Sequence, residues 1–176
     1  MNLNLEEKKI IAKNWFKDLR NSICKEYEDI EYKKSKRKTL FQRTKWKAGG
    51  LSKGGGVFSL INNGSVFEKV GVNISTVSGK FSEEFRKKIP GALKNPNFWA
   101  SGISIVAHMK NPKVPAFHFN TRFIVTTKSW FGGGMDMTPN IKDINQKKYF
   151  HLKIKNMCNL YNKKYYSEHK KNCDNY

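Results

Sequence analysis

The sequence predicts an α+β protein in which a large antiparallel β-sheet is flanked by helices. Near both ends of the chain, apolar residues recur at three- and four-residue steps, which is typical of amphipathic helices. Between these ends, several stretches alternate apolar and polar residues, as half-buried strands do. The chain has 176 residues and is 38% hydrophobic, so we expect one domain with a buried core, spanning residues 1–176.

The first expected element is a helix over residues 5–32. Its apolar side chains form one stripe with charged residues between them: Leu5, Ile10, Ile11, Trp15, Leu19, Ile23 and Tyr27. The basic run that follows at 33–38 (KKSKRK) favours a solvated linker over a site for phosphate or an acidic partner. Residues 48–56 (AGGLSKGGG) are predicted to form a glycine-rich loop.

The core of the sheet is expected at about 57–131. Residues 64–77 alternate in strand fashion, and 100–131 are rich in strand-forming residues. Between them, 81–97 predict a short polar helix or loop bounded by prolines. Helical periodicity returns after Pro139, which predicts a C-terminal helical segment over about 140–170.

The net charge of +20 invites a nucleic-acid interpretation, but its composition does not favour one. The basic residues are 29 lysines and only five arginines, whereas base and phosphate recognition favours the planar guanidinium of arginine. Lysines occur in every segment, which indicates a general surface bias. We therefore expect no nucleic-acid partner, and charge alone supports the alternative.

The lack of a secretory signal and the spacing of the cysteines indicate a cytoplasmic protein. The N-terminal residues lack the apolar region of a secretory signal, and the longest apolar run is too short to span a membrane, so no transmembrane segment is expected. The three cysteines are widely spaced and include no CxxC pair, which argues against a disulfide framework or a zinc knuckle.

Residues 101–123 carry the strongest indication of a functional site. Two prolines and an asparagine at 109–115 predict the turn of a β-hairpin. A turn centred on Lys113 gives three facing pairs: His108 with His118, Val106 with Asn120, and Ser104 with Arg122. A slip of one residue would undo this pairing.

The two faces of this hairpin differ in character. The odd-numbered face is apolar and predicts a core face, formed by Ile103, Ile105, Phe117, Phe119 and Phe123. The even-numbered face carries two of the four histidines and one of the five arginines, and from Ser104 to His108 and His118 to Arg122 it has no lysine. This favours a site, although the solvated face of an antiparallel sheet gives a similar pattern.

Two further features belong to the candidate site. His108 and His118 are suitable metal ligands with His151 as a third, but on the residues alone His151 fits a helix surface better. Residues 129–139 (SWFGGGMDMTP) contain three glycines, which permit a tight turn or close approach to a ligand or strand. No Gly-Lys-Ser/Thr follows, so a phosphate loop is excluded.

Asp136, held by a glycine turn, is either a desolvated functional acid or a cap.

Three strings in this order resemble aerobic coproporphyrinogen III oxidases: VFEKVGVNIS (66–75), GISIVAHMKNPKVPAFHFNTRF (102–123) and WFGGGMDMTP (130–139). The likeness runs from about Trp46 to Tyr176. It implies oxidative decarboxylation of two propionates of coproporphyrinogen III to vinyls in haem biosynthesis, with dioxygen as co-substrate. It also implies a homodimer built on a large antiparallel sheet. The reduced tetrapyrrole supplies the electrons, so no organic cofactor is expected.

The resemblance also implies roles for individual residues. Ser104, Asn120, Thr121 and Arg122 match substrate-binding positions, and His118 matches the proposed proton donor. Asp136 matches the acid proposed to engage the pyrrole nitrogens. His108, His118 and His151 match histidines associated with a divalent metal ion in bacterial members.

The family pattern continues beyond the position of Tyr176, so the domain is expected to be C-terminally incomplete. Three hypotheses follow. The chain is part of an active oxidase that needs a complementary C-terminal chain, or it binds the tetrapyrrole without activity, or it is a basic nucleic-acid-binding protein. We expect weak or absent turnover from the chain alone.

Overall fold

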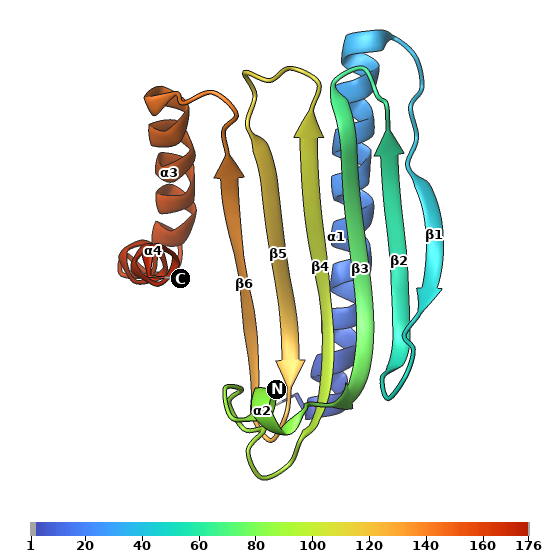
Figure 1. Ribbon diagram of the computed structural model, residues 1–176, viewed down its shortest axis with the longest axis vertical. Coiled ribbons are helices and arrows are strands. Elements are labelled where there is room, and N and C mark those ends of the chain that lie inside the picture. The colour runs from blue at the N-terminus through green and yellow to red at the C-terminus, as the bar shows by residue number, and fades with distance from the viewer. Residues whose placement is uncertain (1–2, 176) are drawn as a thin grey trace.

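A computed structural model describes residues 3–175 and confirms the α+β prediction (Figure 1). Six antiparallel strands form one sheet in the order β1-β2-β3-β4-β5-β6, so each strand pairs with its neighbours in sequence. The elements in chain order are α1 (Leu5–Ser35), β1 (Gln42–Lys47), β2 (Lys53–Asn62), β3 (Phe67–Lys80), α2 (Glu83–Arg86), β4 (Asn97–Met109), β5 (Ala116–Val125), β6 (Ser129–Thr138), α3 (Ile144–Asn159) and α4 (Tyr165–Asp174).

Helix α1 begins with a capping box and ends later than its apolar pattern indicates. Asn4 Oδ1 accepts a hydrogen bond from the backbone N–H of Glu7, and the Glu7 carboxylate accepts one from the backbone N–H of Asn4. At the other end, Lys36 adopts a left-handed conformation with φ of 57°. The helix thus includes the first three residues of the basic run, which was expected to be a linker.

The core lies between α1 and one face of the sheet. Figure 1 shows α1 passing behind β3 and β4, which are the strands that it contacts. Phe16 and Cys24 of the helix are each only 1% exposed and pack among Val70, Val72, Ile103 and Ile105 of those strands. Burial of a side chain such as Phe16 contributes about 1.5–3 kcal/mol. The odd-numbered face of β4 is therefore the core face, as its sequence predicts.

A buried carboxylate ties the end of α1 to the start of β3. Glu31 is fully buried, and its two carboxylate oxygens accept hydrogen bonds from the backbone N–H groups of Ser65, Val66 and Phe67 at 2.5, 2.9 and 2.8 Å. A Cβ atom at Gly64 would lie 2.3 Å from Glu31 Oε1, so glycine makes room for this contact. Three donors compensate the cost of burying the charge.

Two glycine-rich segments belong to strands. The sequence predicted a loop for the first, and for the second it left open a tight turn or close approach to a ligand or strand. Gly54, Gly55 and Gly56 belong to β2, so the loop before it is confined to 48–52. Residues 132–134 belong to β6 and pair with β5. Their neighbours hold these segments extended by backbone hydrogen bonds, which override the weak strand preference of glycine.

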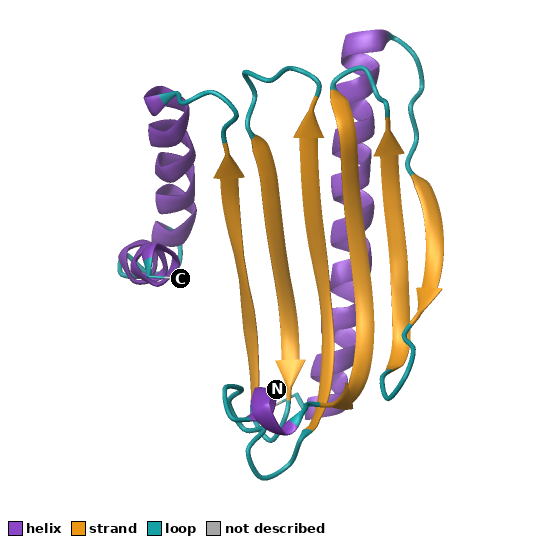
Figure 2. Cartoon of the chain, viewed as in Figure 1, coloured by secondary structure: helices purple, strands orange, loops and turns teal. Residues whose placement is uncertain are grey.

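Apart from the four-residue α2 at one end of the sheet, the second face carries no helix within the described residues (Figure 2). We call this surface, opposite α1, the open face. Helices α3 and α4 lie beside β6 at the edge of the sheet, where Phe150 of α3 contacts Phe117 of β5 with ring centroids 6.4 Å apart. Within residues 3–175, none of the helices combines the length and apolar character that crossing a bilayer requires.

Candidate active site on the open face

The β4–β5 hairpin has a register two residues away from the expected one. Val106 faces His118, Ser104 faces Asn120, and Gly102 faces Arg122. The pairing of His108 with His118 is therefore wrong. The tight turn closes where the Val114 N–H donates to the Asn111 carbonyl, so the hairpin is centred one residue earlier than Lys113. A shift of two leaves each side chain on its expected face.

Facing residues form rows across the open face, because opposite side chains in antiparallel strands point the same way. Three rows cross β4, β5 and β6: Val106 with His118 and Asp136, Ser104 with Asn120 and Gly134, and Gly102 with Arg122 and Gly132. The register thus brings together five of the predicted residues, namely Ser104, His118, Asn120, Arg122 and Asp136.

His118 and Asp136 form a hydrogen-bonded pair across the β5–β6 ladder. The distance from His118 Nδ1 to Asp136 Oδ2 is 2.9 Å, and the two side chains are 37% and 59% exposed. Asp136 is therefore neither desolvated nor held in a turn, which corrects the expectation from the glycine motif. Its role within the chain is to accept the Nδ1 proton of His118 and to orient the imidazole.

A hydrogen-bonded chain continues from this pair along β5. Arg122 Nη2 donates to Asn120 Oδ1 at 2.7 Å, and Asn120 Nδ2 lies 3.4 Å from His118 Nε2. Guanidinium groups only donate, so the Asn120 oxygen must face Arg122 and its amide nitrogen must face the imidazole. This network favours the His118 tautomer with the proton on Nδ1, which leaves a lone pair on Nε2.

Glycines keep the open face bare beside this network. A Cβ atom at Gly134 would meet no atom within 4 Å, and one at Gly132 would first meet Trp130 Nε1 at 3.6 Å. Packing does not require glycine at either position, so their effect is open space beside Asn120 and Arg122. Gly102 differs, because its Cβ would lie 2.7 Å from Arg122 Cβ. The arrangement gives a flat ligand access to backbone and polar side chains together.

Thr121 and His151 do not share this face. Thr121 pairs with Ile103 and Gly133 on the side of the sheet that faces α1. There it lines a cavity of about 520 Å³ between β5, β6, α3 and α4, together with His151, whose Nδ1 lies 3.1 Å from the hydroxyl of Tyr166. The substrate-binding role expected for Thr121 therefore stays a prediction without support from its placement.

The three histidines of the expected metal set are not brought together. His118 lies on the open face beside Asp136, His151 lies in the cavity on the other side, and His108 faces Lys69 of β3. Across residues 3–175, no group of three or more His, Cys, Asp or Glu side chains is placed to hold a metal ion. The residues of this chain alone do not fit the metal, so no chemical step is derived through it.

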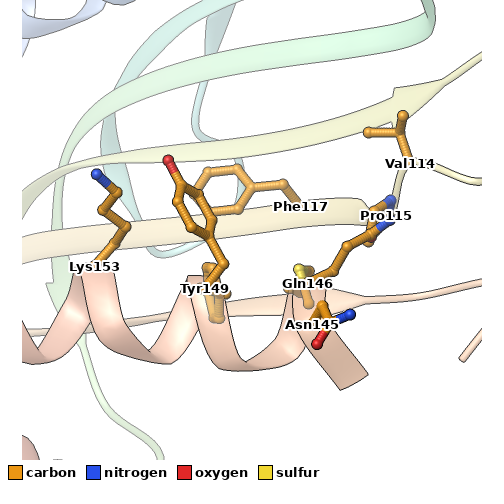
Figure 3. A pocket seen from close by; sticks show the side chains of 9 residues that line it. Val114, Pro115, Phe117, Asn145, Gln146, Tyr149 and Lys153 are labelled. Carbon is orange, nitrogen blue, oxygen red and sulfur yellow. The ribbon is translucent and has the colours of Figure 1, made fainter. Parts of the chain in front are cut away.

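A second hollow lies between the β4–β5 turn and α3 (Figure 3). It has a volume of about 490 Å³ and is lined mainly by apolar side chains, with Phe117 and Tyr149 at its centre. Its polar contacts are structural: Gln146 Nε2 donates to the Lys113 carbonyl, and Lys153 Nζ lies 5.1 Å from the Tyr149 ring centroid. This hollow lacks the titratable groups of the open face.

Comparison with known proteins identifies the family. The sequence model described as Coproporphyrinogen III oxidase matches residues 11–176, nearly the whole chain. The chain belongs to the coproporphyrinogen III oxidase family. Three relatives of similar identity carry the name oxygen-dependent coproporphyrinogen-III oxidase. They come from Rickettsia akari (52% identical over 174 residues), Rickettsia felis (54% over 164 residues) and Rickettsia bellii (49% over 170 residues).

Alignment with these oxidases covers the chain and only part of each relative. It includes 97%, 91% and 94% of this chain, and 61%, 58% and 60% of the oxidases from R. akari, R. felis and R. bellii. The chain therefore spans about 60% of the length of the coproporphyrinogen oxidases that it matches. The open-face network lies within the part that the coproporphyrinogen III oxidase model matches.

Proposed function

We propose that this chain provides the tetrapyrrole-binding face of an oxygen-dependent coproporphyrinogen III oxidase. In that reaction each of two propionates loses carbon dioxide and two hydrogen atoms and becomes a vinyl group. Dioxygen takes up the two electrons and two protons of each step and becomes hydrogen peroxide. The observation that carries the proposal is the hydrogen-bonded network of Arg122, Asn120, His118 and Asp136 beside Gly132 and Gly134 of β6.

Arg122 is the anchor for a carboxylate of the substrate. One of its terminal nitrogens donates to Asn120, and the guanidinium retains further N–H groups for a forked contact with a propionate. A charge-assisted contact of this kind contributes about 1.5–3 kcal/mol. Ser104, directly opposite Asn120, adds a hydroxyl to the same row.

His118 and Asp136 supply the acid–base chemistry. In exchange for the 3.4 Å contact from Asn120 Nδ2, the Nε2 atom of His118 accepts a proton released as the propionate chain is oxidised, and the Asp136 carboxylate stabilises the resulting imidazolium. The second oxygen of Asp136, Oδ1, accepts a long hydrogen bond of 3.5 Å from Thr138 Oγ1 and keeps a further lone pair for the pyrrole N–H groups, where it stabilises positive charge as electrons leave the ring. Dioxygen is the co-substrate, and the reduced macrocycle itself is the reductant, so no organic cofactor takes part.

The surroundings of the site belong to the same proposal. The coproporphyrinogen oxidases that the chain matches extend well beyond the aligned region. Within the described residues, no layer of helices or strands covers the open face. We propose that a complementary C-terminal segment or chain covers this face, that the assembled enzyme is a homodimer, and that it acts in the cytoplasm. The isolated chain then binds the substrate but turns it over weakly.

The test separates binding from turnover. The chain is incubated with coproporphyrinogen III without oxygen, air is admitted, and the porphyrins are separated by chromatography after oxidation. We expect bound substrate and little of the product with two propionates. Vigorous turnover would show that this part of the fold is sufficient and would contradict the need for a covering segment. An absence of binding would overturn the proposal itself.

Arg122→Ala and Lys36→Gly provide a matched pair for the binding measurement. Each removes one positive charge, and glycine tolerates the left-handed backbone at Lys36, which lies at the end of α1. We expect Arg122→Ala to weaken binding by about tenfold, because it removes a charge-assisted contact, and Lys36→Gly to leave it unchanged. Equal effects would indicate general attraction by a basic surface.

A further inference from the structure

The polar row at the centre of the open face continues onto β3. Asn73 lies directly opposite Ser104, which in turn lies opposite Asn120. Three adjacent strands therefore each place one neutral polar side chain on the same face. Strands are about 4.8 Å apart, so the backbones at Asn73 and Asn120 are separated by about 9.6 Å, a span comparable with the width of a macrocycle.

The orientation of the Asn73 amide is fixed by a tryptophan. Trp46 Nε1 donates to Asn73 Oδ1 at 3.1 Å, across two strand pairings and 27 residues of sequence. An indole N–H is only a donor, so the amide oxygen must face Trp46 and the NH₂ group must face away from it. Within the described residues, Asn73 Nδ2 makes no hydrogen bond. Asn73 is only partly buried, so these two N–H donors remain available.

Glycines make room for the aromatic groups beside Asn73. A Cβ atom at Gly56 would lie 2.9 Å from Trp46 Cε2, and one at Gly71 would lie 3.1 Å from Phe58 Cε2. The Trp46 and Phe58 rings therefore lie against glycine backbone on either side of the Asn73 row. Phe58 is 38% exposed, although it is a large apolar side chain. Together they form an apolar border around a single oriented amide.

The charge around Asn73 favours an anionic ligand. Strands β1, β2, β4 and β5 contain no acidic residue, and the one in β3, Glu68, lies five positions from Asn73. A ligand carboxylate placed beside Asn73 would therefore meet no negative charge from the neighbouring strands. Neutral N–H donors that face such an anion form charge-assisted hydrogen bonds, and no further cation is required.

We propose that Asn73 is a further substrate-binding residue, which donates from Nδ2 to a propionate carboxylate at the edge of the macrocycle opposite Arg122. Trp46 is its positioning residue, because it touches the amide and not the carboxylate. This inference rests on the proposed function and adds a second anchor to it. Two anchors that lie two strand spacings apart fix the rotation of the tetrapyrrole on the face, and so determine which propionate lies beside His118.

The test is an equilibrium titration of the full chain with coproporphyrin III, the stable oxidised tetracarboxylate, followed by porphyrin fluorescence. Asn73→Ala is expected to weaken binding by about tenfold, and Asn73→Asp by more, because it places a negative charge beside the carboxylate. Trp46→Phe keeps an aromatic ring but frees the amide to rotate, so a smaller loss of about threefold is expected. Thr44→Ala, an exposed position on the same face of β1, is the control.

The binding measurements on these variants distinguish a failure of this inference from a failure of the proposed function. If the unsubstituted chain does not bind coproporphyrin III, the proposed function fails. If it binds and Arg122→Ala weakens binding, but Asn73→Ala and Asn73→Asp bind as tightly as the unsubstituted chain, only the assignment of Asn73 is overturned. Thermal unfolding of each variant checks that it is folded. Asn73→Thr replaces any variant that does not fold, because threonine suits a strand and keeps one donor. We expect Asn73→Thr to retain part of the binding affinity. Complete loss of binding, or unchanged binding, would count against the assignment.

Discussion

Asp136 lies directly opposite His118 across the β5–β6 ladder, with its Oδ2 atom 2.9 Å from the Nδ1 atom of the imidazole. The pair is formed by backbone register and not by a flexible loop, so its geometry follows from the sheet. Asn120 approaches the other ring nitrogen at 3.4 Å. These two contacts together determine which nitrogen carries the proton in the neutral ring.

The first prediction concerns this tautomer. In the unsubstituted chain, neutral His118 is expected to carry its proton on Nδ1, because the Asp136 carboxylate accepts it. In Asp136→Leu the population of the Nδ1–H form should fall, since the acceptor is lost and only the 3.4 Å contact from Asn120 Nδ2 to Nε2 still favours it. The imidazole ¹⁵N chemical shifts at alkaline pH distinguish the two forms. Identical shifts in both proteins would show that the hydrogen bond to Asp136 does not orient the ring.

The second prediction concerns the bare surface beside Asn120. Gly134→Val adds a side chain that meets no protein atom at its Cβ position, and valine favours strands. We expect unchanged or higher thermal stability and a loss of coproporphyrin III affinity of about tenfold, because the added methyl groups occupy the ligand's space. Gly102→Ala is the contrasting variant, since its Cβ would lie 2.7 Å from Arg122 Cβ and should lower stability. Tight binding by folded Gly134→Val would contradict the proposed ligand position.

The third prediction concerns Glu31. Glu31→Gln replaces one acceptor with an NH₂ group that faces backbone N–H donors, so it should lower the free energy of unfolding by about 2–4 kcal/mol. Urea denaturation measures the change. Glu26→Gln, on an exposed part of the same helix, should change stability by less than about 0.5 kcal/mol. Similar effects of the two substitutions would remove the anchoring role of Glu31.

The fourth prediction concerns the thiols. Burial beneath the sheet raises the pKa of Cys24, so little of it is thiolate at mildly alkaline pH, whereas Cys173 is exposed. Iodoacetamide at such a pH should label Cys173 rapidly and Cys24 only after unfolding, as measured by mass spectrometry of the peptides. Rapid labelling of Cys24 in the folded chain would show that α1 does not pack as described.

The sequence was sufficient to predict the face of each hairpin residue but not its partner. Strand alternation has a period of two, so the open face of β4 and β5 survives a register error of two residues, and the odd-numbered core face of β4 is confirmed by Ile103 and Ile105. The pairing of His108 with His118 failed because the position of a turn with two prolines depends on one backbone hydrogen bond, from Val114 to Asn111. The sequence carries a local signal for that bond, because asparagine at the first position and proline at the second favour a turn over residues 111–114.

Features that depend on several strands at once were beyond sequence reasoning. For glycines 132–134 the sequence left open a tight turn or close approach to a ligand or strand, and the ladder with β5 decides for a close strand pairing. The Trp46–Asn73 hydrogen bond needs the registers of β1, β2 and β3 together. By contrast, strand alternation alone places Thr121 on the odd-numbered face, although the family resemblance groups it with Asn120 and Arg122. The composition of a motif is therefore a poor guide to which of its members share a face.

The most direct test of the central claim asks on which face the tetrapyrrole binds. Porphyrins shift nearby methyl resonances strongly through their ring current, and the two faces carry separate reporters. Val106, 42% exposed, faces His118 on the open face, whereas Ile154 lines the cavity behind β5 and β6. On addition of coproporphyrin III, we predict that the methyl signals of Val106 move and those of Ile154 do not. Movement of Ile154 with Val106 unchanged would place the ligand in the cavity and contradict the account.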